Sequence, residues 1–243
     1  MPTYKEVLNI NEQYAIDNNK EDSAIKRLLL HFSNMDSSEL LLNLNEEMPE
    51  ELYNDFLYGV DRFIIQNIPV QHIIGYEYFF GYEFIVNSDV LIPRFETEEL
   101  VANVLEQYDD VFNGTDVDVV DIGTGSGCLA VTLSVEEKGM NVIATDISEK
   151  ALVVAKQNNN KLGGRVTFYQ GDMLEPVKAM KFDILVSNPP YIPNDEFVED
   201  LVKSNEPHVA LFGGKDGLDF YRIILKDAKL GSLGATFAKK IKD

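Results

Sequence analysis

The sequence is poor in cysteine and histidine. Cys128 is the only cysteine among 243 residues, which excludes an intrachain disulfide and a zinc site built from several thiolates. The three histidines (His31, His72 and His208) lie far apart and lack the spacing of metal ligands. We therefore expect no metal cofactor.

Basic residues are also scarce. The chain has 21 Lys+Arg against 41 Asp+Glu, a net charge of −20. Non-specific binding to a nucleic-acid backbone draws most of its affinity from Lys and Arg that release counterions, so this balance argues against a nucleic-acid partner. The same charge is compatible with a cationic small-molecule ligand or a basic protein partner.

Long apolar runs are missing as well. No stretch approaches the roughly 20 apolar residues of a membrane span, and the N-terminus has no basic region followed by an apolar run. With 45% hydrophobic and 26% charged residues, the composition is that of a soluble globular protein. We expect a cytoplasmic monomer with no membrane partner.

The first seventy residues carry a helical pattern, with apolar residues every three or four positions. Ser37 and Ser38 are placed to cap one helix, Pro49 fits the first turn of a later helix, and Pro69 is expected to end it. No catalytic constellation occurs here. Residues 1–70 are therefore predicted to form a helical substrate-docking domain.

The composition changes in residues 71–94. Aromatic and β-branched residues dominate, and Gly75 and Gly81 interrupt them at positions suited to turns, which predicts a β-hairpin linker. A helix is then expected from Thr97 to Leu105.

From residue 95 to residue 243 we expect one α/β domain. Buried strands are predicted at VDVVDIG, NVIATDIS, RVTFYQGD and FDILVSNPPY, separated by helices over 127–137, 148–161 and, less clearly, 175–180. Strands alternating with helices at this spacing indicate βαβ crossovers and a parallel, Rossmann-like sheet covered on both faces.

A glycine-rich turn ends the first of these strands. In Asp121-Ile-Gly-Thr-Gly-Ser-Gly127, glycines at alternate positions permit a sharp turn and close approach of a ligand to the backbone. The spacing differs from the GxGxxG of dinucleotide folds, and no Lys-Ser/Thr pair follows as a phosphate loop requires. A purely structural turn remains an alternative.

Asp146 ends the second strand about twenty residues later, where a carboxylate can accept hydrogen bonds from ribose hydroxyls. Its alternative role is in a helix N-cap with Ser148. Asp121, the glycines and Asp146 together resemble the S-adenosylmethionine (SAM) site of Rossmann-like methyltransferases. In such enzymes the position of Asp172 and Met173 faces the adenine, although a plain turn explains this pair equally well.

The segment Asn188-Pro189-Pro190-Tyr191 follows the fourth strand, at the sheet edge where ligands of such folds bind. Two prolines stiffen the backbone and leave carbonyls free to accept hydrogen bonds. The carbonyls of Asn188 and Pro189 can hold both hydrogens of a planar NH2 group, which directs its lone pair toward a methyl carbon on a sulfonium. Tyr191 offers an aromatic wall, and a rigid turn is the alternative.

Several motifs in order resemble the HemK/PrmC family, the release factor glutamine methyltransferases. LIPRFETEELV (91–101), PVQHIIGYEYFFGYEFIV (69–86) and ALFGGKDGLDFYR (210–222) resemble family segments, as does the helical N-terminal domain. The resemblance covers residues 20–226. It implies methylation of the side-chain amide of the glutamine in the GGQ loop of peptide chain release factors, with SAM as donor and S-adenosylhomocysteine as product.

The resemblance also implies roles for individual residues. No strong general base is needed, because an oriented amide lone pair attacks an activated methyl group. The residues carried over are, for the cofactor, Asp121, Gly123, Thr124, Gly125, Ser126, Gly127, Asp146, Asp172, Met173 and Asn188; for the glutamine amide, Asn188, Pro189, Pro190 and Tyr191; and for a substrate cleft between the domains, Arg94, Glu96, Thr97 and Glu98.

The sequence departs from the family in two places. Phe95 stands where the family usually has proline. After Arg222, the family continues through two or three strands, whereas residues 223–243 offer at most one, near 234–238. The C-terminal strands thus look truncated, and we expect an exposed strand edge or apolar face.

Two other functions remain open. Adenine methylation of DNA or RNA uses the same four-residue grip, but it requires a flipped base and a positive surface, which the net charge of −20 does not favour. A non-catalytic SAM-binding protein is the other alternative, because of the short C-terminus.

Overall fold

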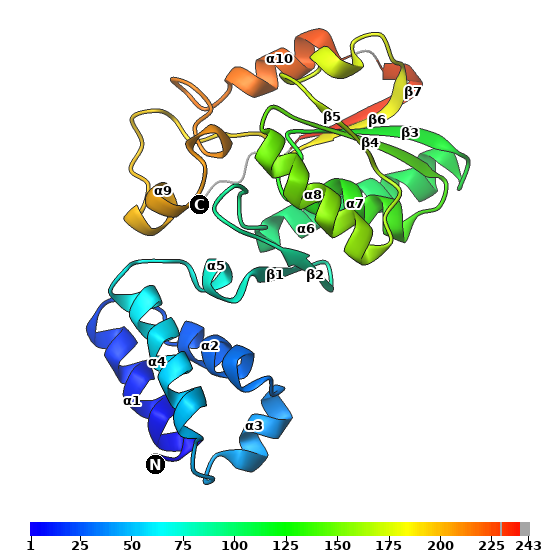
Figure 1. The fold of residues 1–243 in the computed structure, drawn as a ribbon. Coiled ribbons are helices and arrows are strands. Elements are labelled where there is room, and N and C mark those ends of the chain that lie inside the picture. The colour runs from blue at the N-terminus through cyan, green and yellow to red at the C-terminus, as the bar shows by residue number, and fades with distance from the viewer. Residues whose placement is uncertain (229, 239–243) are drawn as a thin grey trace. The chain divides into compact units, whose positions relative to one another are not determined.

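The computed structural model of the chain describes residues 1–228 and 230–238. They form two compact units, one from Met1 to Gly75 and one beginning at Tyr76 (Figure 1). None of the helices in this described part is long and apolar enough to span a membrane.

The first unit is the expected helical domain. Its core is formed by apolar side chains such as Ile25, Leu28, Leu29 and Phe56, each with no exposed surface. The helices are α1 (Tyr4–Asp17), α2 (Ser23–Ser33), α3 (Ser37–Asn43), α4 (Glu50–Ile64) and α5 (Val70–Ile74).

Two details of this unit differ from the prediction. The cap of α3 is Asp36, whose carboxylate accepts from the backbone N–H groups of Ser38 and Glu39, because Asp36 has the extended backbone that an N-cap needs. Helix α4 already ends at Ile64, and Pro69 opens the short helix α5 instead. Residues 71–74, expected in the hairpin, are therefore helical.

The second unit begins with an antiparallel hairpin, β1 (Tyr76–Phe79) and β2 (Tyr82–Ile85). Phe80 and Gly81 make the turn with positive φ values of 51° and 80°. Helix α6 (Phe95–Gln107) follows and starts two residues before the expected Thr97, with Arg94 as its N-cap residue.

A five-stranded, fully parallel sheet forms the centre of this unit, in the order β5-β4-β3-β6-β7. The chain moves outward from β3 in one direction and then returns to its other side, which places a topological switch point between β3 and β6. The strands are β3 (Val117–Ile122), β4 (Met140–Asp146), β5 (Thr167–Gln170), β6 (Phe182–Ser187) and β7 (Leu230–Ala238).

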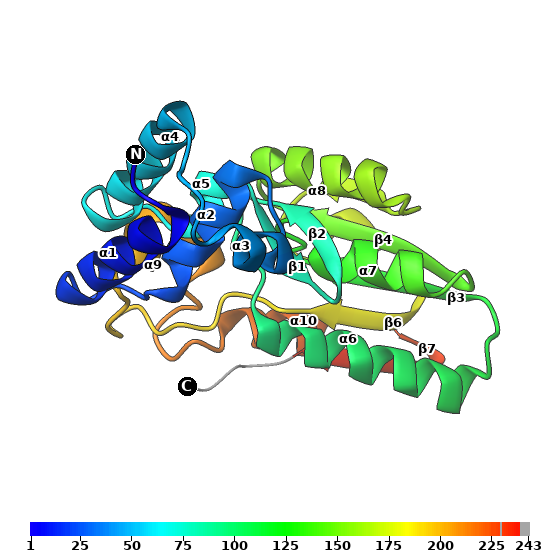
Figure 2. The same ribbon diagram turned by 90° about the horizontal axis from the view of Figure 1, so that it is seen from below.

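Helices cover both faces of the sheet, as predicted (Figures 1 and 2). On one face, Val119 and Ile184 pack with side chains of α6 and of α7 (Cys128–Glu136). On the other face, Ile122 and Leu185 pack with Ile224 of α10 (Asp219–Asp227). The remaining helices are α8 (Glu149–Leu162) and α9 (Asp200–Asn205), and the expected helix over 175–180 is a single 3-10 turn, Glu175–Val177.

The last strand matches the prediction of one strand near 234–238. Within the described residues, β7 pairs only with β6 and its other edge has no strand partner. The predicted exposed strand edge corresponds to this edge of β7, and residues 239–243 lie outside the described part of the chain.

Candidate active site

The glycine-rich turn joins β3 to α7 at the switch point. Gly123, Gly125 and Gly127 have φ values of 73°, 55° and 83°, which side chains with a Cβ adopt only with strain. A Cβ on Gly127 would lie 3.1 Å from that of Ala155, whereas at Gly123 and Gly125 the described residues beyond the two chain neighbours place no atom within 4 Å of the Cβ position. The turn therefore needs glycine, and two of its glycines face open space.

Asp146, at the end of β4, fastens this turn. Its Oδ2 accepts from the N–H of Gly125 at 2.8 Å, and its Oδ1 accepts from the N–H of Ser148 at 2.8 Å. Ser148 in turn caps α8 through Ala151. Burial raises the pKa of Asp146, although the backbone donors oppose this rise. From the sequence, Asp146 could either bind a ligand or take part in a helix cap. In the structure its carboxylate joins the glycine-rich turn to the start of α8.

Asp121 is fully buried at the end of β3. Burial raises the pKa of its carboxyl group to about 7; the hydroxyl of Thr124 opposes this shift and the nearby carboxylate of Asp146 adds to it. Within the described residues, neither carboxylate oxygen of Asp121 forms a hydrogen bond of normal geometry. Two carboxyl groups thus lie beside the turn in a setting that favours a cation.

Asp121→Asn should make the protein more stable at alkaline pH. Between about pH 4 and pH 7 the unfolded chain has released a proton that the folded protein retains, so the free energy of unfolding falls as pH rises through this window. We expect denaturant unfolding at pH 8 to give the variant a free energy of unfolding roughly 2–4 kcal/mol above that of wild type. This difference should become smaller toward pH 5. Asp118→Asn, an exposed carboxylate on the same strand, is the control, and a gain independent of pH would contradict the prediction.

Asp172 and Met173 follow β5, on the same edge of the sheet. Asp172 is exposed, and Met173 is half-buried with a positive φ of 46°. The backbone carbonyl of Met173 accepts from the hydroxyl of Thr145, next to Asp146. This bond ties the β5 turn to the end of β4, so the pair lies beside the predicted cofactor site.

The Asn188–Tyr191 segment leaves β6 at the switch point. The Nδ2 of Asn188 donates to the hydroxyl of Thr97 in α6 at 3.2 Å. Its Oδ1 is buried and has no hydrogen-bond partner in the described part of the chain. An unpaired buried acceptor costs about 1–3 kcal/mol, so this oxygen is available to a ligand donor.

A second segment, residues 211–214, braces these prolines. The N–H of Ile192 donates to the carbonyl of Leu211 at 3.0 Å, and the N–H of Gly213 donates back to Ile192 at 2.8 Å. A Cβ on Gly213 would lie 2.4 Å from the carbonyl oxygen of Pro190, so only glycine permits this approach. The conformation of the proline segment thus depends on residues twenty positions further along.

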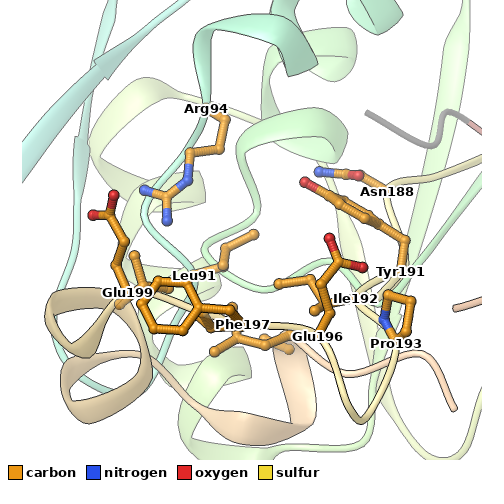
Figure 3. Close-up of a pocket in the computed structure, with 13 residues that line it drawn as sticks. Leu91, Arg94, Asn188, Tyr191, Ile192, Pro193, Glu196, Phe197 and Glu199 are labelled. Carbon is orange, nitrogen blue, oxygen red and sulfur yellow. The ribbon is translucent and has the colours of Figure 1, made fainter. Parts of the chain in front are cut away.

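Two adjoining cavities open at this edge. The larger has a volume of about 590 Å³ and includes Tyr191, Ile192, Phe197 and Leu211 in its wall (Figure 3). The smaller includes Gly123, Thr124, Gly125, Ser126 and Thr97. Three residues line both: Leu91, Arg94 and Asn188. The geometry therefore brings a glycine-lined cavity and a proline-segment cavity together at Asn188.

The residues predicted for a substrate cleft have different surroundings. Arg94 lines both cavities, and Thr97 is buried against Asn188. Glu98 instead accepts from the N–H of Phe80 at 2.8 Å and thereby holds the hairpin turn. Glu96 is exposed and lines neither cavity.

The sequence did not reveal Glu206. Its side chain is 1% exposed, and it forms an ion pair with Arg94 at 2.6 Å. Its other oxygen accepts from the N–H of Ile92 at 2.9 Å. A lone glutamate in a loop carries no periodic signal, so only the fold reveals this pair. Cys128 begins α7 beside the turn, and burial raises the pKa of its thiol to about 12.

Two family models match the chain. The methyltransferase small domain matches residues 96–210, and the PrmC N-terminal domain matches residues 11–75. The first match contains the glycine-rich turn, Asp146 and the Asn188–Tyr191 segment.

Curated relatives match nearly the whole chain. A release factor glutamine methyltransferase from Bacillus subtilis (strain 168) is 47% identical over 238 residues, which are 95% of this chain and 81% of the relative. One from Bacillus cereus is 42% identical over 226 residues, 91% of this chain and 80% of the relative. A solved structure of a methyltransferase from Pyrococcus furiosus is 18% identical with a TM-score of 0.48, covering 80% of this chain and 81% of that chain.

Proposed function

The chain belongs to the release factor glutamine methyltransferase family, and on that premise we propose that it methylates the side-chain amide nitrogen of the glutamine in the GGQ loop of peptide chain release factors, with SAM as the donor. The observation that carries this proposal is the buried Oδ1 of Asn188, which has no hydrogen-bond partner among the described residues and lies at the wall shared by the two cavities.

The residues beside the glycine-rich turn fit SAM. Gly123 and Gly125 leave open the space that a side chain would fill, and the carboxylate of Asp146 lies at the strand end where ribose hydroxyls are bound in such folds. Burial raises the pKa of both Asp121 and Asp146 beside this turn, and a bound sulfonium would favour the charged form of each carboxyl group. When bound, SAM supplies an electrophilic methyl group.

Asn188 orients the acceptor. Because its Nδ2 donates to Thr97, its Oδ1 is fixed on the other side of the amide. An incoming glutamine amide has two N–H donors, of which one can pair with this Oδ1 and the other with the carbonyl of Pro189. A nitrogen held by both hydrogens presents its lone pair in one direction, and the proton leaves after the transfer without a dedicated base.

The larger cavity accommodates the glutamine side chain. Its wall includes Tyr191 and the apolar side chains of Leu91, Ile192 and Phe197. The charged side chains of Arg94, Glu196 and Glu199 also line this cavity, so its wall has both apolar and polar parts.

The proposal is tested by incubating the purified chain with a purified release factor and SAM labelled in its methyl group. We expect one methyl group on the GGQ glutamine, located by tandem mass spectrometry, and none on a release factor in which that glutamine is replaced by alanine. Adenine-containing DNA and RNA oligonucleotides are assayed in parallel. Label on the oligonucleotides instead would overturn the proposal in favour of adenine methylation.

A further inference from the structure

One buried carboxylate holds both the backbone and the side chain of the segment that enters α6. Oε2 of Glu206 accepts from the N–H of Ile92, and Oε1 accepts from Nη2 of Arg94 at 2.6 Å. The Glu206 side chain is 1% exposed, whereas that of Arg94 is 32% exposed. Glu206 is therefore the fixed member of this pair, and Arg94 the member that reaches open space.

Arg94 is the only cationic side chain in the walls of the two cavities, as drawn from the described part of the chain. Its guanidinium projects into the larger cavity, opposite Tyr191 (Figure 3). A guanidinium has five N–H donors in one plane, and the bond to Glu206 takes one of them. The neighbouring wall residues Leu91 and Phe197 offer no side-chain donor.

We propose that Glu206 is a positioning residue that aims the guanidinium of Arg94 at a backbone carbonyl of the acceptor loop. The inference rests on the proposed function, because a Gly-Gly-Gln loop has two residues without side chains and exposes backbone carbonyls instead. A fixed, planar donor recognises such a loop through its main chain. The pairing with Glu206 offsets the positive charge of Arg94, and Glu196 and Glu199 add two carboxylates to the wall of the larger cavity, so the site suits a neutral carbonyl rather than an anion.

The test is steady-state methylation of a purified release factor by two single variants and the double variant. Glu206→Gln keeps an acceptor for Ile92 but loses the charge that holds Arg94. Arg94→Lys keeps the charge that neutralises Glu206 but loses the planar donors. We expect each to raise KM for the release factor at least tenfold with kcat within threefold of wild type. The KM of the double variant should lie within twofold of the KM of the more impaired single variant.

Three measurements separate this role from a structural one. The SAM dissociation constant, by calorimetry, should stay within twofold of wild type, and the thermal midpoint shows that each variant is folded. Lys161→Ala removes an ion pair of the same 2.6 Å distance, between α8 and the hairpin, and should leave KM unchanged. Effects that multiply in the double variant, or a weakening of SAM binding equal to that of KM, would overturn the inference.

Failure of the proposed function is distinguishable from failure of this inference. If wild type does not methylate the release factor, the proposed function is wrong and the inference with it. If wild type is active and both single variants match it in KM, the inference alone is wrong.

Discussion

Replacing Asn188 with alanine should lower glutamine methylation by about 100-fold or more while SAM affinity stays within about threefold of wild type, because the loss of one preorganised hydrogen-bonding group costs that much in turnover. The alanine variant lacks the buried Oδ1 that orients the acceptor amide. The glycine-rich turn is fixed by Asp146 and does not depend on Asn188. The measurement is single-turnover methylation of a release factor, with calorimetric titration of SAM.

A second substitution tests how Asn188 is oriented. Thr97→Val removes the acceptor for the Nδ2 of Asn188 but preserves the shape of a side chain that is 3% exposed. The amide of Asn188 can then rotate, so we expect a smaller loss of turnover, about tenfold, with SAM affinity unchanged. Turnover of Asn188→Ala within threefold of wild type would show that the amide is not gripped in this way.

The parts of the fold that the sequence predicts are those with local causes. The sequence of residues Val117–Ile122 predicts strand β3, because its apolar side chains pack alternately on the two covered faces of the sheet. The glycine-rich turn is equally local, since positive φ values select for glycine. Asp121, Asp146 and Asn188 follow from these elements, because carboxyl ends of parallel strands meet at one edge.

The parts that the sequence does not reveal depend on partners far along the chain. Arg94 and Glu206 are separated by 112 positions, and Phe80 and Glu98 by 18, so no spacing rule connects either pair. Glu98 was expected to line the substrate cleft because of the motif around it, yet its carboxylate caps the hairpin turn at Phe80, a non-glycine residue with positive φ. Tertiary packing decides such roles.

The second large effect is expected at Asp146. Asp146→Ala removes the acceptor for Gly125 and for Ser148, and thereby loosens the turn and the start of α8 together. SAM binding should weaken at least tenfold, about 1.4 kcal/mol, because both the ribose acceptor and the shape of the turn are lost. Calorimetric titration of SAM measures this change directly.

Asp146→Asn separates the charge of this residue from its shape. The amide has the size of the carboxylate, but its NH2 group must face the N–H of Gly125 or that of Ser148, and two donors cannot pair. We therefore expect SAM binding to weaken nearly as much as in the alanine variant. Glu149→Ala, which removes an exposed negative charge three residues away, is the matched control and should bind SAM within twofold of wild type.

Thermal melts distinguish the two roles of Asp146. If it fastens the turn, the midpoint of the ligand-free protein falls in Asp146→Ala, since two backbone donors lose their partner. If it also binds the ribose, the rise in midpoint that SAM produces in wild type, through preferential binding to the folded state, becomes smaller in the variant. An unchanged SAM affinity would remove Asp146 from the cofactor site, and an unchanged ligand-free midpoint would remove it as the anchor of the turn. Because both oxygens of this carboxylate already accept backbone hydrogen bonds, we expect the SAM affinity and the ligand-free midpoint both to fall in Asp146→Ala.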